Sequence, residues 1–539
     1  MKKSIIASIA LALCIVMLAL SAGCGSTGTQ TTEETQPQSA GSSESAGDAT
    51  TQPDTVTPSG EAQELVVGGR QVALSLDPTG SRDSNYLVKI GAGEMLFKVD
   101  KDGVIQPLLA ESIEQLDSTH WSLKLRQGVT FWSGRAMDSE AVIASLERSR
   151  ELDAKAQSFL NGMSFEKTGD YEITIETELD NMTVPLNLST FQLIIHNAEY
   201  GYTSPEDTDF TGMYKIDEYV PGQKMRLSVN KDYWGKKPVI EQIVYEQISD
   251  DQSRTLGALS GRYHVMLNIP AASVKQFEGN DEVAIVSETT DSVQTIYLNL
   301  KQPQLQDAHV RQALSWALDR DELVLFGAEG YSSPVTTWIG GNPQFSDAKN
   351  LFFDSYNLGK AGALLDEAGW ETGSDGLRYK DGQVLRVRLL TWGTEKMLGE
   401  AIQSQWTKLG VKAEVSHIDY TQIEAARETG DWDASIEAWS TFGNPSAMLD
   451  AQYAPGASGN YGGFDDQKTN ELLERLRVAE NDHVRHTLVL ELAGRVAEQS
   501  PAIYLFPRPG ITAISASLEG FVPHFRQIEN VVTADLRIK

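Results

Sequence analysis

A tract with almost no apolar residues, running from residue 25 to residue 60, divides this chain and limits where it can fold. Serine, threonine, glutamine, glycine, glutamate and proline dominate the tract, and its only apolar residues are alanines and Val56. Such a segment buries too little apolar surface to offset the entropy of ordering, so it predicts a disordered, mildly acidic tether. Ordered structure is expected to begin near Glu64, where Leu65, Val66 and Val67 predict a strand.

The residues before the tether predict an export signal. A short cationic start precedes an apolar run over residues 4–20, which is just short of a comfortable membrane span. The sequence LSAGC at residues 20–24 resembles the lipobox of bacterial lipoproteins, with serine in place of the usual leucine three positions before Cys24. We expect residues 1–23 to be a signal peptide, Cys24 to carry lipid, and residues 24–62 to tether the folded part outside the membrane. The alternative is an uncleaved signal anchor.

Cysteine placement and charge exclude several classes of function. Cys14 and Cys24 are the only cysteines, so the globular part can hold no disulfide framework, no cysteine-ligated metal and no cysteine nucleophile. The chain has 45 basic and 75 acidic residues, a net charge of -30. A surface this acidic repels phosphate backbones, so we expect no nucleic-acid partner.

Alternating strand and helix patterns after the tether predict an α/β protein. Residues 121–126 alternate apolar and polar side chains, as a half-buried strand does. Residues 384–390 predict another strand, which is followed by a helical stripe of Leu398, Ala401, Ile402, Trp406 and Leu409. Gly410 is placed to end that helix, and residues 411–415 predict the next strand of a β–α–β unit.

Two further helices are marked by their ends. Asp138 can cap a helix whose apolar face carries Val142, Ile143, Leu146 and Leu152. Residues 359–368 predict another helix, with Gly369 just past its end. Together these patterns predict an α/β class with mixed sheets in more than one lobe.

Motifs that carry catalysis are mostly absent. The sequence has no His-Glu-x-x-His, no P-loop and no Gly-x-Ser-x-Gly. Residues 23–28 match a dinucleotide pattern but lie at the signal junction, without the flanking strand and helix that the motif requires. Asp100 to Gly103 matches only the start of a calcium loop, so a plain turn is favoured. His483 and His486 could share a metal on one helix face, but their polar neighbours favour a solvated face. We therefore predict neither an enzyme nor a metal or cofactor site.

Aromatic residues on glycine-, asparagine- and serine-rich stretches predict a ligand site. Rigid aromatics on such loops can cover an extended organic ligand in a cleft, although each could instead close a lobe surface. The candidate ligand-binding residues are Trp338, Trp439, Ser440, Thr441, Phe442, Asn444, Tyr461 and Phe464.

A series of segments resembles the family-5 extracellular solute-binding proteins, which are the oligopeptide-, dipeptide- and nickel-binding receptors of ABC importers. Residues 121–134, WSLKLRQGVTFWSG, contain the LRxGVxFxxG core of that family nearly intact. Other matching segments, in the family's order, are residues 106–112, 211–215, 230–235, 259–261, 307–313, 317–320 and 356–370. The resemblance extends from about residue 64 to residue 539.

The resemblance implies a two-lobed, type II periplasmic-binding-protein fold with an extra small domain. Two crossing segments, near residues 297–300 and 504–506, would act as hinge strands. Markers such as Gly134, Trp234 and the pair Asp319-Arg320 are expected to be fold residues. The implied domains are lobe I at 64–98, 208–298 and 507–539, the small domain at 99–207, and lobe II at 299–506.

The implied activity is capture of a small solute between closing lobes and delivery to an ABC permease and ATPase. Peptide-binding members place an aspartate four residues before the proline of one loop, where it pairs with the peptide ammonium. Here that position is Thr441, counted back from Pro445, and Asp450 or Asp465 could replace the missing acid. Nickel-binding members lack the aspartate and hold a metal–organic chelate, for which His196, His264 and His417 are possible contributors.

We expect a short peptide as ligand, and nickel chelates, opines and other organic solutes remain alternatives. The protein is expected to be a monomeric, lipid-anchored receptor beside the cell membrane, in the periplasm if an outer membrane is present. A sensor that uses the same closure and a hydrolase that trims its ligand are the other hypotheses.

Overall fold

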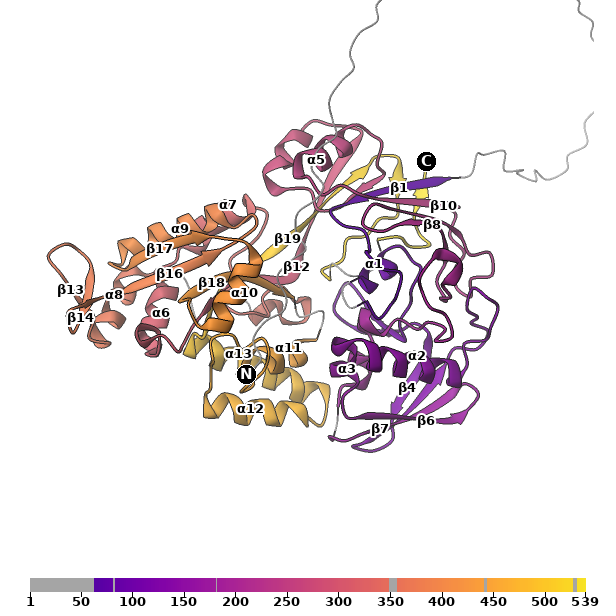
Figure 1. The fold of residues 1–539 in the computed structure, drawn as a ribbon, viewed down its shortest axis with the longest axis horizontal. Coiled ribbons are helices and arrows are strands. Elements are labelled where there is room, and N and C mark those ends of the chain that lie inside the picture. The colour runs from indigo at the N-terminus through magenta and orange to yellow at the C-terminus, as the bar shows by residue number, and fades with distance from the viewer. Residues whose placement is uncertain (1–62, 81–82, 181, 349–355, 441–443, 527–530) are drawn as a thin grey trace, which may run out of the picture. The chain divides into compact units, whose positions relative to one another are not determined.

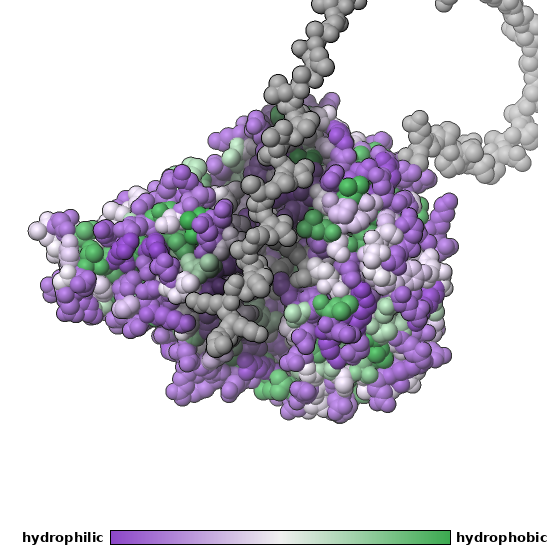
Figure 2. All heavy atoms as spheres, viewed as in Figure 1, coloured by the Kyte–Doolittle hydropathy of each residue, from purple (hydrophilic) through white to green (hydrophobic). Residues whose placement is uncertain are grey.

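The computed structural model describes residues 63–80, 83–180, 182–348, 356–440, 444–526 and 531–539 (Figure 1). The predicted signal peptide, Cys24 and the tether therefore lie outside the described residues. Among those that are described, none of the helices combines the length and the apolar character that a membrane crossing needs. Hydrophilic residues dominate the face shown in Figure 2, as the net charge of -30 leads one to expect.

A ten-stranded sheet forms the centre of the folded part, in the order β17-β16-β18-β12-β19-β11-β1-β10-β9-β8. Its first half consists of β1 (Glu64–Gly69), β8 (Tyr214–Val220), β9 (Lys224–Val229), β10 (Gln242–Gln247) and β11 (Val265–Met266). Its second half consists of β16 (Arg386–Thr391), β17 (Lys412–His417) and β18 (Ala434–Ser440). Two long antiparallel strands, β12 (Val283–Leu298) and β19 (Ala502–Ser515), join the halves.

The pairing of β12 with β19 is interrupted where the chain passes from one half of the sheet to the other. Val283 to Thr289 pair with Pro509 to Ser515, and pairing resumes only at Val293 opposite Pro507. A second shift in register follows after Gln294. Such irregularities bend strands locally and strengthen their twist, so the two halves of the sheet need not lie in one plane.

Helices cover both faces of the second half and bury a separate apolar cluster on each face. One face is covered by α6 (Ala308–Trp316), α7 (Arg320–Ala328), α8 (Leu358–Glu367) and α9 (Lys396–Lys408). The other is covered by α10 (Tyr420–Thr429), α11 (Pro445–Tyr453), α12 (Gln467–Arg477) and α13 (Asp482–Gln499). The middle strand β18 is accordingly buried over Ala434–Glu437, whereas the edge strand β17 keeps exposed polar residues at both ends.

The first half has its own core, to which α1 (Ser84–Lys89) and α5 (Asp251–Leu259) contribute. A separate sheet in the order β4-β5-β7-β6 packs against α2 (Ser139–Leu152) and α3 (Ala154–Leu160). The strands of this separate sheet are β4 (Ala110–Gln115), β5 (His120–Leu125), β6 (Met163–Gly169) and β7 (Glu172–Thr177).

Short elements connect these parts. The strands are β2 (Phe97–Val99), β3 (Ile105–Pro107), β13 (Glu371–Thr372), β14 (Arg378–Lys380), β15 (Gln383–Val384), β20 (Leu518–Glu519) and β21 (Arg537–Ile538). The helical turns are α4 (Val184–Asn187), η1 (Phe191–Leu193), η2 (Pro205–Asp207), η3 (Ala271–Phe277), η4 (Pro303–Leu305) and η5 (Pro343–Ala348).

The mixed α/β class is confirmed, and local signals located most of the predicted elements. Asp138 caps α2 by accepting a hydrogen bond from the Ala141 amide at 2.9 Å. Leu152 was predicted on the apolar face of that helix, but it lies in the last turn with 54% of its surface exposed. The strand predicted at 384–390 is divided at Leu385, where the chain leaves a small hairpin sheet and enters β16.

The predicted fold markers have structural roles. Gly134 adopts φ +89, and the Asp319 carboxylate accepts a hydrogen bond from the Glu322 amide and caps α7. The Trp234 ring donates to the buried carboxylate of Glu94 at 3.1 Å. The buried guanidinium of Arg320 donates to the Tyr504 carbonyl at 2.7 Å, which ties α7 to β19.

Candidate functional site

The carboxyl ends of the parallel strands β16 and β18 meet beside β12 and form the candidate site. In β12, Ser292 lies opposite Ser440 and Val293 lies opposite Trp439, the last residues of β18. The loop between β16 and α9 reaches the same edge, and Gly393 turns the chain there with φ +57. Open sheets with helices on both faces bind ligands at the carboxyl ends of their strands.

Aromatic rings line one side of this edge. Trp439 and Tyr461 are half-buried, with ring centroids 6.5 Å apart, and Tyr461 meets Tyr297 edge-on at 5.5 Å. Trp392, which follows β16, packs against Tyr420 at 4.8 Å. These rings come from five separate elements or loops. Tyr297 is buried, and the partial exposure of the other four leaves apolar surface that an organic ligand can cover.

A buried ion pair between α10 and β18 contacts one of these rings, Tyr461. Arg427 on α10 pairs with Glu437 on β18, and their side chains are only 8% and 6% exposed. The Arg427 guanidinium also lies over the Tyr461 ring at 3.9 Å. Burial raises the pKa of Glu437 and the charge of Arg427 opposes that rise. Because the pair fixes Arg427, it also holds Tyr461 in place through the cation–π contact.

A second polar group occupies the opposite face of the same strands. The Gln294 side chain donates to Oε1 of Glu395 at 2.9 Å, and Glu395 is 8% exposed at the start of α9. Burial raises the pKa of the Glu395 carboxyl to about 7, while the positive charge of Arg508 opposes the rise. The site edge therefore combines aromatic surface with acidic and basic groups.

The residues predicted from the sequence divide between this edge and the core. Trp439, Ser440 and Tyr461 lie at the edge, and the Ser440 hydroxyl donates to Asp291 at 2.6 Å. Trp338 and Phe464 are packed in the core beneath α10 to α13, with 1% and 4% of their surface exposed. Their contact with a ligand remains a prediction.

Asn444 and its neighbours lie at the other end of the same loop. Asn444 caps α11 through the Ala447 amide at 3.0 Å and donates to the Asn187 side chain at 3.1 Å. Thr441 and Phe442 lie outside the described residues. The role of these loop residues in ligand binding therefore stays a prediction.

The acids suggested as substitutes for the missing aspartate are engaged elsewhere. Asp450 pairs with Arg477 at 2.9 Å on exposed helix faces, and Asp465 accepts from Asn470 at 2.8 Å. The structure thus gives both acids protein partners of their own.

The three candidate histidines occupy different environments. His264 accepts from the Val66 amide at 3.0 Å in the first half of the sheet, and burial lowers its pKa. His417 ends β17 and contacts the Thr391 hydroxyl at 3.1 Å, which places it near the candidate edge.

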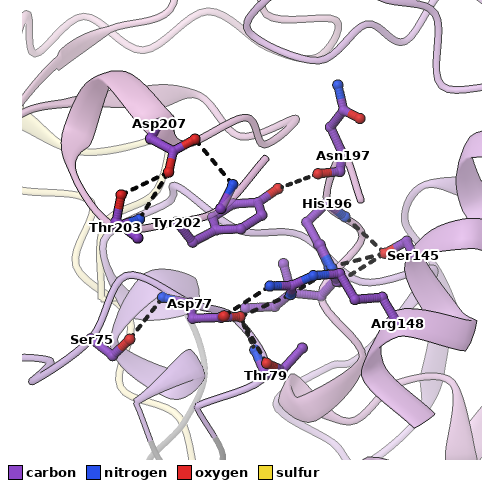
Figure 3. Close-up of polar contacts among 12 residues, drawn as sticks. Ser75, Asp77, Thr79, Ser145, Arg148, His196, Asn197, Tyr202, Thr203 and Asp207 are labelled. Atoms are coloured by element: carbon purple, nitrogen blue, oxygen red, sulfur yellow. Dashed lines mark hydrogen bonds and ion pairs between the residues drawn. The ribbon is translucent and has the colours of Figure 1, made fainter. Parts of the chain in front are cut away.

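His196 belongs to a buried network between α2 and the first half of the sheet (Figure 3). Arg148 donates to both carboxylate oxygens of Asp77, at 2.9 and 2.8 Å, and its guanidinium lies 3.3 Å from His196 Nε2. The Ser145 hydroxyl lies 3.0 Å from the other ring nitrogen. Desolvation lowers the pKa of His196 to about 4, so the ring is uncharged at neutral pH and acts as a packing residue.

The histidine pair on α13 is separated by its packing. His486 stacks on Phe345 with ring centroids 4.5 Å apart, whereas His483 is exposed. Within the described ranges, no group of three histidine, aspartate, glutamate or cysteine side chains is arranged to hold a metal ion.

Sequence reasoning missed the polar residues of the site. Gln294, Glu395 and Arg508 lie on a long strand, a helix start and a second long strand. One signal was available for Glu395, because an acid shortly after the carboxyl end of a predicted strand is positioned for ligand contact. No comparable signal marked Arg508.

Comparisons with known proteins agree with this architecture. The family model described as "Bacterial extracellular solute-binding proteins, family 5 Middle" matches residues 104–460. The nickel-binding protein NikA of Staphylococcus aureus is 23% identical over 81% of this chain and 88% of its own length. The oligopeptide-binding protein AppA of Bacillus subtilis is 25% identical over 80% of this chain and 83% of its own length.

Solved structures show the same fold. NikA from Brucella suis in complex with Fe(III)-EDTA has a TM-score of 0.78 at 22% identity, over 88% of this chain and 100% of that one. AppA from Bacillus subtilis in complex with a nonapeptide has a TM-score of 0.70 at 22% identity, over 89% of this chain and 100% of that one. At this identity the likeness shows the two-lobed fold and leaves the ligand open.

Proposed function

Because this chain belongs to the bacterial extracellular solute-binding proteins of family 5, we propose that it captures a short peptide between two lobes and delivers it to an ABC permease and ATPase. The observation that carries the proposal is the position of the candidate site. It lies at the carboxyl ends of β16 and β18, next to the two long strands that join the halves of the sheet. A ligand there can reach both halves.

The mechanism follows from this placement. A ligand that contacts both lobes only when they close shifts the open–closed equilibrium by its preference for the closed form. Closure removes water and strengthens the polar contacts made to the ligand. The permease then distinguishes a loaded receptor from an empty one by shape.

Peptide binding is supported by relatives and by the chemistry of the site. AppA and the OppA proteins of Lactococcus lactis are named as oligopeptide-binding proteins. The half-buried rings of Trp439 and Tyr461 fit apolar parts of a peptide, and charged groups lie beside them. The alternative is a nickel chelate, because NikA of Staphylococcus aureus is equally similar, and His417 lies near the site edge.

The domain boundaries are part of the proposal. We assign lobe I to residues 64–98, 208–298 and 507–539, the small domain to 99–207, and lobe II to 299–506. The separate sheet of β4 to β7 falls within 99–207, which supports the second of these assignments.

We further propose that Cys24 carries a lipid after removal of residues 1–23, so that the receptor stays beside the outer face of the membrane as a monomer. The LSAGC sequence and the polar tract after it support this. Binding without chemical change is proposed because the relatives named above are binding proteins. A peptide pool recovered in cleaved form after long incubation would contradict that.

Native mass spectrometry of the full-length chain, purified in mild detergent without denaturation, tests the proposed ligand. A ladder of added masses that release as short peptides is the expected result. A single added mass containing nickel would replace the peptide by a chelate. A protein that retains neither after incubation with both would contradict the proposed function.

A further inference from the structure

Two contacts join the small domain directly to lobe II, outside the sheet that the lobes share. The Gln344 side chain donates to the Gly103 carbonyl at 2.8 Å, and the Asn444 side chain donates to the Asn187 side chain at 3.1 Å. On the boundaries proposed above, Gly103 and Asn187 belong to the small domain, and Gln344 and Asn444 belong to lobe II. The sheet of β4 to β7 is separate from the ten-stranded sheet, so these contacts add links that no shared strand provides.

The contact at Gly103 joins a hairpin tip to a helical turn. Gly103 lies between β2 and β3, and Phe97 of β2 is buried in the same core as the sheet of β4 to β7. Gln344 lies in η5, where the neighbouring Phe345 is buried in a core of lobe II and stacks on His486. A Cβ atom on Gly103 would lie only 2.8 Å from Cγ of Gln344. Because Gly103 also turns the chain with φ +83, glycine suits both the turn and the contact.

The contact at Asn444 is oriented from both sides. The side-chain oxygen of Asn444 accepts from the Ala447 amide at 3.0 Å and caps α11, which leaves its nitrogen to donate to Asn187. The side-chain nitrogen of Asn187 donates to the Phe159 carbonyl at 3.2 Å, which leaves its oxygen to accept. Each asparagine is therefore held by a backbone group of its own domain, and the two side chains can pair without rearrangement.

Both contacts must break when the lobes separate. The lobes are joined through β12 and β19, whose pairing is interrupted between Thr289 and Val293, so their arrangement can change there. A hydrogen bond between two protein groups needs no ligand, so these two contacts favour closure whether or not a ligand is bound. Each is a neutral amide hydrogen bond, of the kind that shifts an equilibrium by about two- to tenfold.

We propose that the pairs Gln344–Gly103 and Asn444–Asn187 form a clasp, through which the small domain sets how readily lobe II closes before a ligand binds. This inference rests on the proposed binding function and adds a control of its affinity. When a ligand binds only the closed form, its apparent affinity falls in proportion to the closed fraction, so the clasp raises affinity by raising that fraction. Two weak contacts suit this role, because a much stronger clasp would keep the empty receptor closed and remove the difference in shape that the permease distinguishes.

Distances between spin labels on the two sides of the clasp test the inference. Ser158 on α3 and Glu474 on α12 are exposed and can carry the labels as Ser158→Cys and Glu474→Cys. Cys14→Ser and Cys24→Ser remove the two native thiols from the full-length chain. Pulsed electron paramagnetic resonance, on protein in detergent that has been freed of co-purified small molecules, measures the distances between the labels. With an intact clasp we expect a short-distance population beside a long-distance one before any peptide is added.

A double variant, Gln344→Ala with Asn187→Ala, removes both hydrogen bonds of the clasp. The ratio of the short- to the long-distance population should fall by about four- to a hundredfold, because the effects of the two contacts multiply. The matched control is Gln304→Ala with Gln403→Ala, which removes two amide hydrogen bonds to backbone carbonyls within lobe II and should leave the ratio unchanged. Circular dichroism spectra that match wild type verify that both variants are folded.

Gly103→Ala tests the first contact by a different route, because the added Cβ displaces Gln344. Gly376→Ala is its matched control: Gly376 has φ +82, its amide also closes a turn, and a Cβ there meets nothing within 4 Å. The backbone strain is thus the same in both variants, and only Gly103→Ala should lower the ratio of the two populations. Equal ratios would contradict the contact at Gly103.

The outcomes separate the clasp from the function on which it rests. The same distance distribution in the intact protein and the double variant would overturn the clasp, and so would an intact protein without a short-distance population before peptide is added. A library of di- to tetrapeptides is then added to both proteins. The peptides should restore the short distance in the double variant, at a higher concentration than the intact protein needs. Peptides that shift neither protein would contradict the peptide proposal, while the peptide-free measurement would still decide the clasp.

Discussion

At the scale of single residues, the environment of a charge decides what it does in this protein. Asp450 and Arg477 form an ion pair in which the side chains remain 37% and 40% exposed, whereas Arg427 and Glu437 are almost fully buried. Exposed pairs contribute little because water screens them, while a buried charge that loses its partner is strongly destabilising. A carboxylate–guanidinium pair therefore contributes very differently to stability in the two places.

Replacing Arg427 by methionine tests this difference. Arg427→Met leaves Glu437 buried without its cation, and we expect unfolding to cost about 3–5 kcal/mol less free energy than in wild type at pH 8. Arg477→Met, which breaks the exposed pair, should cost less than about 1 kcal/mol. Urea unfolding of both variants measures the difference. Equal losses of unfolding free energy in the two variants would contradict the greater importance of the buried pair.

Glu395 should make stability depend on pH. Its folded-state pKa of about 7 lies above the ordinary 4.5, so its contribution is complete below pH 4.5 and is lost as the pH rises through 7. From the two pKa values the loss is on the order of 3 kcal/mol. Glu395→Gln should remove this pH dependence, so that the stability of the variant relative to wild type rises between pH 5 and pH 8.

The measurement is urea unfolding of both proteins at the two pH values, without ligand. Subtracting the unfolding free energy of the variant from that of wild type at each pH isolates the contribution of Glu395 from those of other groups that titrate in this range. A difference that is independent of pH would show that Glu395 has an ordinary pKa. Asp450→Asn, which neutralises an exposed acid paired with Arg477, serves as the control and should follow wild type.

At the scale of elements, close backbone contacts position the loops that carry the site. The loop containing Tyr461 is held against β12 by a hydrogen bond from the Leu300 amide to the Gly462 carbonyl at 3.0 Å. A Cβ atom on Gly462 would lie 2.1 Å from the Leu298 carbonyl oxygen. Only glycine permits this approach, and the approach brings Tyr461 next to Tyr297 and Arg427.

Gly462→Ala should therefore displace this loop. We expect a loss of about 1–3 kcal/mol in the free energy of unfolding, as for other overpacked sites, and weaker binding of whichever ligand native mass spectrometry identifies. Gly359→Ala is the control, because a Cβ there meets nothing closer than 3.5 Å and alanine favours the helix α8. Scanning calorimetry of both variants measures the effect. A melting temperature of Gly462→Ala equal to that of wild type would contradict the importance of this contact.

At the scale of the whole molecule, the net charge of -30 opposes compactness. Like charges repel one another across the surface, and salt screens this repulsion with a Debye length of about 10 Å at 0.1 M. The local ion pairs are mostly exposed and weak, so their own screening should not dominate.

Added salt should consequently stabilise the protein. Between 10 mM and 150 mM sodium chloride at pH 7.5, we expect the melting temperature to rise by a few degrees, because screening lowers self-repulsion more in the folded state than in the expanded one. Scanning calorimetry at both concentrations measures this change. A fall in melting temperature would mean that attractive ion pairs outweigh the net repulsion.

The sequence by itself determined the class of the fold, most local elements and the family. Periodicity located α9 and β17, and caps such as Asp138 and terminators such as Gly410 marked helix ends, because these signals act within a few residues along the chain. The order of short segments over most of the chain indicated the family, which the match over residues 104–460 confirms.

Only the tertiary structure decided which residues share the site. Trp338 and Phe464 resembled Trp439 and Tyr461 in sequence context, yet the first two are packed in the core and the other two lie at the strand edge. Glu395 and Arg508 are more than a hundred residues apart, and β12 brings them to one face of the sheet. Burial and charge proximity arise from contacts between distant segments, and no local pattern encodes them.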